Sequence, residues 1–221
     1  MNLKTIIRMY VQRIRPRARA ELDWFIQQPT LLAAIENAAL ARNSRGERYS
    51  HQRRIKRAAI QEAFSLLSGA SDRIKRTRDF AELFQLISAL LEDVPGIGEL
   101  YVYDTSLRIG AKLNLFPKKV YLHAGTRLGA RALGLQAGAM LDVSDLPREF
   151  RSLLPHEIED ALCIFKGEFK ASAPIGATAD LANRSWCGYH HAGSSVSQIL
   201  PLSPIPPAPA HTCCGRASAR L

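Results

Sequence analysis

The chain has 221 residues, enough to bury one core of ordinary size and to carry a terminal extension. Its 30 Lys and Arg against 20 Asp and Glu give a formal net charge of +10, which favours polyanionic partners such as nucleic acid. No apolar run approaches the ~18 residues of a membrane span, and the 4 cysteines lack the spacing of a disulfide framework, so we expect a cytoplasmic protein.

Residues 1–20 predict a basic N-terminal helix. Apolar residues recur there at helical spacing, at Leu3, Ile6, Ile7, Tyr10, Val11 and Ile14. The segment contains several arginines and no acid, and we expect Pro16 to end or kink the helix. An ordinary first helix that packs by its apolar stripe is the favoured interpretation. A membrane-surface helix and an organelle presequence are the alternatives.

Residues 21–170 predict a compact all-α domain of several helices. Helices are expected over 31–42, 50–68, 80–91, 99–114, 118–124, 126–133 and 155–165. Thr30, Ser50 and Asp79 are the expected N-caps, because their side-chain oxygens can accept from free N–H groups of the first turn. Pro117 and Pro155 stand at expected helix starts.

The most basic stretch covers residues 42–57, where Glu47 is the single acid. Arg48, Arg53, Arg54 and Arg57 are the candidate phosphate contacts, because a basic loop that opens a helix suits an anionic backbone. The alternative is a charged face that is simply solvated.

The stretch 94–98 reads Val-Pro-Gly-Ile-Gly and separates two helical segments. Pro95 cannot continue a helix, Gly96 and Gly98 permit positive φ, and Ile97 can plug the turn into a core. Over about residues 84–107 this arrangement resembles the helix-hairpin-helix motif of DNA-binding proteins. The resemblance implies that the backbone of residues 96–98 holds a DNA phosphate without reading bases. The alternative is a purely structural turn, which the adjacent Glu99 favours.

The body also resembles an uncharacterised bacterial protein family, with residues 48–55, 98–105 and 121–127 as its recognisable blocks. That resemblance implies no activity. Further cations are expected to extend the phosphate-binding surface around the hairpin, namely Arg108, Lys112, Lys118, Lys119, Arg127 and Arg131.

Asp104 is the one candidate catalytic residue. Residues 103–108 partly resemble the aspartate motif of DNA glycosylases of the helix-hairpin-helix type, but Asp104 lies within the expected second hairpin helix. Its alternative role is an ion pair with Arg108 at i+4. The run 156–160 lacks the second histidine of the zinc pattern His-Glu-x-x-His, so neither a metal site nor a cofactor is predicted.

Residues 171–221 are rich in proline, and we expect a disordered tail without a metal site, although it holds several cysteines and histidines. The sequence as a whole predicts non-sequence-specific binding to nucleic acid, with DNA the favoured partner. The alternative is a helical protein-interaction or structural module, followed by a DNA-repair enzyme. Binding is favoured over catalysis, and the sequence gives no indication of the oligomeric state.

Overall fold

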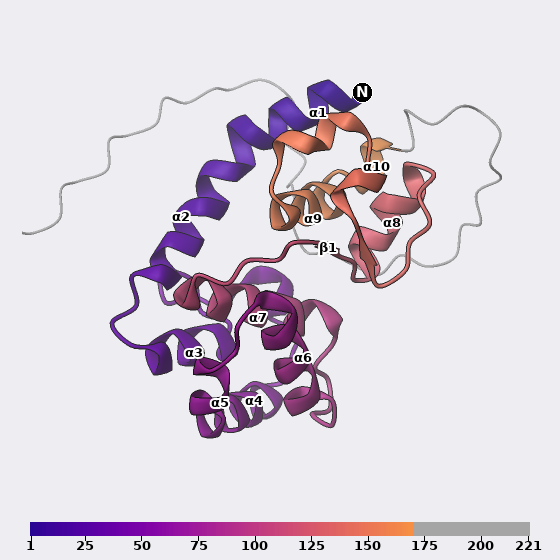
Figure 1. Cartoon of the computed structure of the whole chain (residues 1–221). Helices are drawn as coiled ribbons and strands as arrows, with labels where there is room; N and C mark the ends of the chain where they lie inside the picture. Colours follow the sequence, from indigo (N-terminus) through magenta and orange to yellow (C-terminus); the bar gives the residue numbers. More distant parts are fainter. Residues whose placement is uncertain (170–221) are drawn as a thin grey trace, which may run out of the picture. The chain divides into compact units, whose positions relative to one another are not determined.

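The computed structural model describes residues 1–169, and this part of the chain is mostly helical (Figure 1). The helices are α1 (Leu3–Met9), α2 (Arg15–Ile26), α3 (Leu31–Ala39), α4 (Arg57–Gly69), α5 (Ser71–Lys75), α6 (Phe80–Leu91), α7 (Glu99–Leu113), α8 (Ala124–Ala132), α9 (Pro155–Ile164) and α10 (Lys166–Phe169). Short 3₁₀ turns cover Ser50–Gln52, Val143–Asp145 and Arg148–Ser152. The helical class is therefore confirmed, whereas the predicted tail lies outside the described residues.

Two short strands, β1 (Val120–Tyr121) and β2 (Met140–Leu141), form an antiparallel pair that the sequence did not predict. The helix expected over 118–124 is wrong. Val120 is fully buried opposite Leu141, and Tyr121 lies opposite Met140. A β-branched and an aromatic residue suit such a half-buried ladder, and their partners stand about twenty residues further along the chain.

Helices α1 and α2 form one continuous helix, because a π turn at Tyr10–Ile14 joins them. Pro16 does not end this helix. Proline lacks the N–H for an i−4 bond, and its ring crowds the preceding turn. The wider π turn directly before it, closed by the Arg15 N–H to the Tyr10 carbonyl, accommodates that ring. The helix therefore crosses the domain boundary predicted at residue 20.

The π turn also sets which side chains face α9. Five residues in an α-helix rotate a side chain by about 140°, whereas a wider π turn with its i→i+5 hydrogen bond brings residues i and i+5 closer to the same side. The Tyr10 hydroxyl donates to Asp160 Oδ2 at 3.3 Å, and Arg15 Nη2 donates to Glu157 Oε2 at 2.8 Å. Both acceptors belong to α9, so the turn aligns two polar contacts to a single helix.

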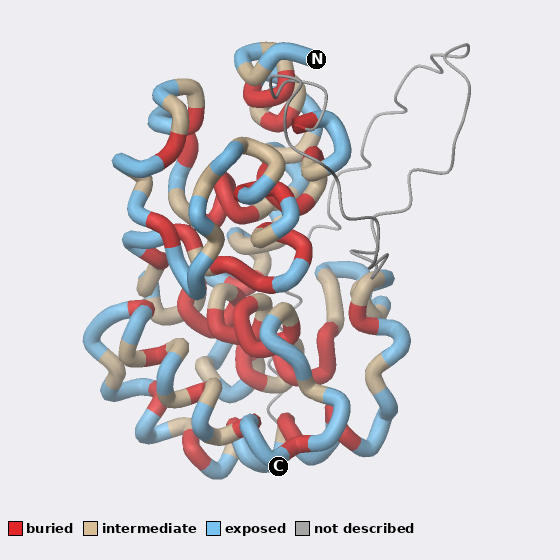
Figure 2. The backbone as a smooth tube through the Cα atoms, turned by 90° about the vertical axis from the view of Figure 1, so that its right-hand side faces the viewer, coloured by how far each residue is buried: buried red, intermediate tan, exposed pale blue. Residues whose placement is uncertain are grey.

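The apolar side chains form two clusters, and buried segments lie along the inner sides of the helices (Figure 2). The first cluster takes Phe25 of α2 together with buried residues of α3, α4, α6 and α7. The second takes Ile6, Ile7 and Tyr10 together with buried residues of β1, β2, α8, α9 and α10. The α1–α2 helix therefore contributes to both clusters.

Local end signals account for most of the helix boundaries. Thr30 Oγ1 accepts from the Ala33 N–H at 3.0 Å, and Asp79 Oδ1 accepts from the Glu82 N–H at 2.9 Å. Asn114 adopts the left-handed conformation, with φ 57°, directly after α7. The N-cap predicted at Ser50 is wrong, because α4 begins only at Arg57.

Candidate functional site

The turn between α6 and α7 joins two packed helices, as the sequence predicts. Val94 is 4% exposed, and Ile97 packs against the first apolar cluster. Gly96 has φ +89°, which requires glycine, whereas Gly98 has φ −118° and ψ 173°, an extended backbone that any residue adopts. A Cβ added at Gly98 would meet nothing within 4 Å. Gly98 therefore leaves open space over the start of α7 without being needed for the turn itself.

The first turn of α7 presents free backbone N–H groups. Its first intrahelical bond runs from the Val102 N–H to the Gly98 carbonyl at 3.1 Å, so the N–H groups before Val102 have no helical acceptor. The positive end of the helix dipole adds to their attraction for an anion. The Glu99 carboxylate pairs with Arg127 Nη2, which compensates its negative charge.

The basic stretch docks on the N-terminal half of α7. His51 Nε2 and Gln52 Nε2 donate to Asp104 Oδ2 at 2.7 and 2.8 Å. Asp104 stands five residues into α7, about 8 Å along the axis from its start. Arg53, Arg54 and Arg57 follow directly and are exposed. The stretch therefore lies beside the same end of α7 as the hairpin turn.

Some of the other predicted phosphate contacts are bonded within the protein, and others remain exposed. Arg48 Nη1 donates to the Ile55 carbonyl at 3.1 Å, and Lys112 Nζ donates to the carbonyls of Ile26 and Gln28. Arg48 therefore stabilises the loop before α4, and Lys112 stabilises the end of α2. Cations that remain exposed on the β1–α8 side are Lys118, Lys119 and Arg131, with Lys119 Nζ 3.1 Å from Asp142. Arg127 is half-buried and also donates to the Leu122 carbonyl at 2.7 Å.

Arg108 is not on the surface. It is 7% exposed, its Nη2 donates to Asp104 Oδ2 at 3.1 Å, and its guanidinium lies 3.8 Å from the centre of the Tyr49 ring. Its Nη1 also donates to Gln52 Oε1 at 3.3 Å. The guanidinium is therefore occupied within the protein, and its structural role is to fix the basic stretch to α7.

Asp104, the candidate catalytic residue, sits in the middle of this network. Burial raises its pKa, but Arg108 and His51 outweigh that effect and hold the pKa below its usual range. Its Oδ2 already accepts from three side chains, and Asp104 does not line the pocket described below. The geometry instead gives Asp104 the i+4 pairing role that the sequence offered as the alternative.

A layer of buried polar side chains on α9 escaped sequence analysis. His123 Nε2 donates to Glu159 Oε1 at 2.6 Å, and His123 Nδ1 accepts from the Gly125 N–H at 3.2 Å. Both ring nitrogens are therefore used, and the second bond places the proton on Nε2. Burial raises the pKa of Glu159, against the lowering effect of His123. The sequence signal was a histidine directly before a helix start, which acts here as the N-cap of α8.

Glu157 forms the other part of this layer. It is 2% exposed and accepts from Arg15 at 2.8 Å and from Arg19 at 3.1 Å. The Tyr103 hydroxyl is buried near Glu159 and Asp160, without a hydrogen-bond partner among the described residues. Burial, with Glu159 and Asp160 nearby, raises its pKa well above the usual value. Arginines and carboxylates 140 residues apart thus meet, which no local pattern indicates.

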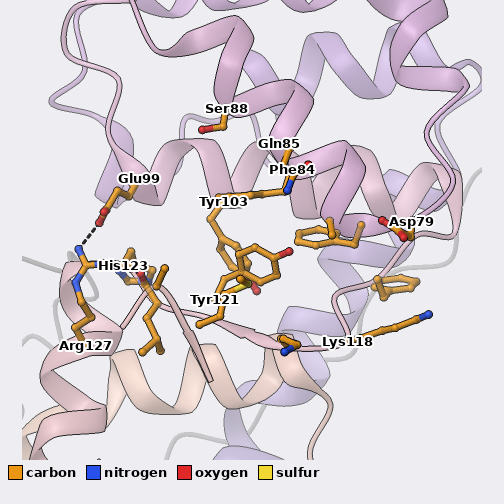
Figure 3. A pocket seen from close by; sticks show the side chains of 17 residues that line it. Asp79, Phe84, Gln85, Ser88, Glu99, Tyr103, Lys118, Tyr121, His123 and Arg127 are labelled. Atoms are coloured by element: carbon orange, nitrogen blue, oxygen red, sulfur yellow. Dashed lines mark hydrogen bonds and ion pairs between the residues drawn. The ribbon is translucent and has the colours of Figure 1, made fainter. Parts of the chain in front are cut away.

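A pocket of about 560 Å³ lies beside this layer (Figure 3). Aromatic side chains and charged side chains of both signs line it, together with His123. The lining residues include Asp79, Phe80, Phe84, Ser88, Glu99, Tyr103, Phe116, Lys118, Lys119, Tyr121, His123 and Arg127. This size is typical of small-molecule sites, which span roughly 300–1,000 Å³. The sequence indicated the cations but not the pocket.

Within residues 1–169 no group of three or more His, Cys, Asp and Glu side chains is arranged to hold a metal ion. In the same part of the chain no helix combines the length and apolar character that a membrane crossing needs. The cysteines and histidines of the C-terminal segment lie outside the described residues.

Comparison of the chain with protein-family models, with curated proteins and with solved structures finds no match.

Proposed function

We propose that the chain binds nucleic acid without reading its sequence, through the open start of α7 and the exposed cations around it. One observation supports this proposal: separate basic segments meet at the N-terminal half of α7. His51 and Gln52 dock the basic stretch there, and Arg127 joins α8 to Glu99. Backbone N–H groups and arginines are typical phosphate contacts, and neither type carries sequence information. DNA is the favoured partner.

The first test uses Gly98, because its geometry separates folding from binding. Gly98→Val should cost no more than about 1 kcal/mol, since the backbone is extended and a Cβ would meet nothing within 4 Å, although Val is a poorer N-cap than Gly. A branched side chain over the α7 amides should nevertheless weaken DNA binding about tenfold, the loss of one good phosphate contact. Thermal melting and fluorescence anisotropy at low salt measure the two effects. If the Gly98→Val protein folds and binds DNA with the affinity of its parent, the turn has a purely structural role.

The second test removes charge from the basic stretch. Arg53→Ala combined with Arg57→Ala should weaken DNA binding and reduce the slope of log affinity against log salt by about two units. The matched control is Arg73→Ala with Lys75→Ala on α5, which removes the same charge. These residues follow α4, whose length places its far end about 18 Å from Arg57. Equal salt slopes for the two double variants would show that the basic stretch is a solvated charged face that makes no phosphate contact.

A helical structural or protein-interaction module is the second candidate. Glu92 and Asp93 stand exposed beside the turn and carry charge that repels phosphate. Val94 and Ile97 also give the turn a packing role. In that case the Gly98 variant and its parent would both ignore DNA at low salt.

A further inference from the structure

The pocket is built around a cluster of four aromatic rings. Phe80 and Phe84 come from α6, Tyr103 from α7 and Tyr121 from β1. The Tyr121 ring lies centrally, with centroid distances of 4.7 Å to Phe84, 5.2 Å to Phe80 and 5.8 Å to Tyr103. The cluster is therefore a continuous aromatic wall made by three separate elements.

Part of this wall remains open to a ligand. Phe80 and Tyr103 are each 2% exposed, whereas Phe84 and Tyr121 are only half-buried and border the pocket. Partly exposed aromatic rings in a concave site favour a flat partner, because a planar ring can pack against them. The shape and chemistry of the wall thus select a planar, aromatic group.

Of the charged side chains that line the pocket, Lys118 and Asp79 have no ion-pair partner among residues 1–169, and the Asp79 carboxylate caps α6 through the Glu82 N–H. Arg127 pairs with Glu99, and Lys119 pairs with Asp142. Lys118 is exposed and has no ion-pair or hydrogen-bond partner among residues 1–169. In Figure 3, Glu99 and Arg127 mark one end of the pocket, Tyr103 and Tyr121 lie between, and Lys118 lies toward the opposite end, on the same side as Asp79. An anionic group attached to a stacked ring would find its counter-charge there.

We propose that this pocket binds a nucleoside monophosphate, with the base against Phe84 and Tyr121 and the phosphate at Lys118. A volume of about 560 Å³ suits a ligand of this size. The pocket shares Glu99 and Arg127 with the start of α7, but the proposal does not rest on the hairpin function, because neither Gly98 nor the basic stretch lines the pocket. The two proposals can therefore fail separately.

The experiment titrates the full-length protein with AMP by isothermal titration calorimetry. Adenosine, which lacks the phosphate, and ribose 5-phosphate, which lacks the base, are the matched probes. AMP should bind about tenfold more tightly than either, because stacking and one charge-assisted contact each contribute about that factor.

Two variants assign the binding to this pocket. Phe84→Leu keeps an apolar side chain against the first cluster but removes the ring, and AMP affinity should fall about tenfold. Lys118→Gln should lower AMP affinity to the level of adenosine while leaving adenosine itself unaffected. Lys75→Gln, on exposed α5 outside the pocket, is the charge-matched control and should change nothing.

Several results would overturn the proposal. They are no AMP binding at millimolar concentration, AMP binding that survives both pocket variants, and binding of single-stranded oligonucleotides without binding of AMP. If Phe84→Leu fails to fold, the exposed Lys118→Gln decides the matter. Loss of DNA binding in the Gly98 variant with unchanged AMP binding would leave the pocket and the hairpin as independent sites.

Discussion

Replacing Gly129 by alanine is expected to destabilise the fold by about 3 kcal/mol or more, because α8 and α9 touch at this residue. A Cβ at Gly129 would lie 2.2 Å from the Leu162 carbonyl oxygen and 2.9 Å from its carbonyl carbon. These are backbone atoms of a helix and cannot rotate away. The helices must therefore separate, which loosens the second apolar cluster and the His123–Glu159 contact.

Gly69→Ala is the matched control for Gly129→Ala. Gly69 ends α4, and a Cβ there would meet nothing within 4 Å. Alanine should stabilise by up to about 1 kcal/mol, because glycine loses more conformational freedom in a helix. Urea unfolding followed by far-UV circular dichroism measures both variants. A Gly129→Ala protein as stable as its parent would mean that α8 and α9 are not in such close contact.

Asp104→Asn should cost about 3–5 kcal/mol, because it leaves the buried Arg108 guanidinium without its counter-charge. Arg108→Met in the same chain should recover much of this loss, since it removes the uncompensated charge and keeps an apolar stem over Tyr49. A double-mutant cycle by urea unfolding measures the coupling. Strictly additive single costs would show that the two side chains do not depend on each other.

The same aspartate predicts a pH dependence with a definite sign. The pKa of Asp104 is lowered in the folded protein, so its contribution to stability is present above its unfolded pKa of about 3.9. That contribution is lost as the pH falls through the lower folded value. Asp104→Asn should therefore flatten the acid limb of the stability profile, and an unchanged limb would contradict the assignment.

Sequence patterns predicted the elements whose signals are local. The apolar face of α6, the Asp79 cap, the 94–98 turn and the start of α7 at Glu99 all lie within about twenty residues. The errors arose where distant residues decide. Val120 and Tyr121 form a strand because β2 supplies the partner. Residues 50–56 stay outside α4, and two of them, His51 and Gln52, bond to Asp104 instead.

The candidate site divides in the same way. The two hairpin glycines are close to each other in sequence, and so are the exposed arginines of residues 53–57. Composition and spacing therefore indicated both groups. Gly96 and Gly98 looked equivalent there, although only Gly96 has positive φ. The pocket required α6, α7 and β1 to meet, and the Glu157 ion pairs join helices at opposite ends of the described chain. These contacts between distant segments depend on how the helices pack, and a single sequence gives no direct signal for that packing.

The continuous α1–α2 helix has a consequence for how the protein unfolds. Ile6, Ile7 and Tyr10 in its first part are buried in one apolar cluster and Phe25 near its end is buried in the other, with the Arg15 and Arg19 ion pairs between them. Helix formation is cooperative, and a half-helix that loses its packing is marginal in water. Because this helix supplies side chains to both clusters, we expect the opening of one to weaken the other, and we expect the described chain to unfold as one cooperative unit rather than as two independent foldons.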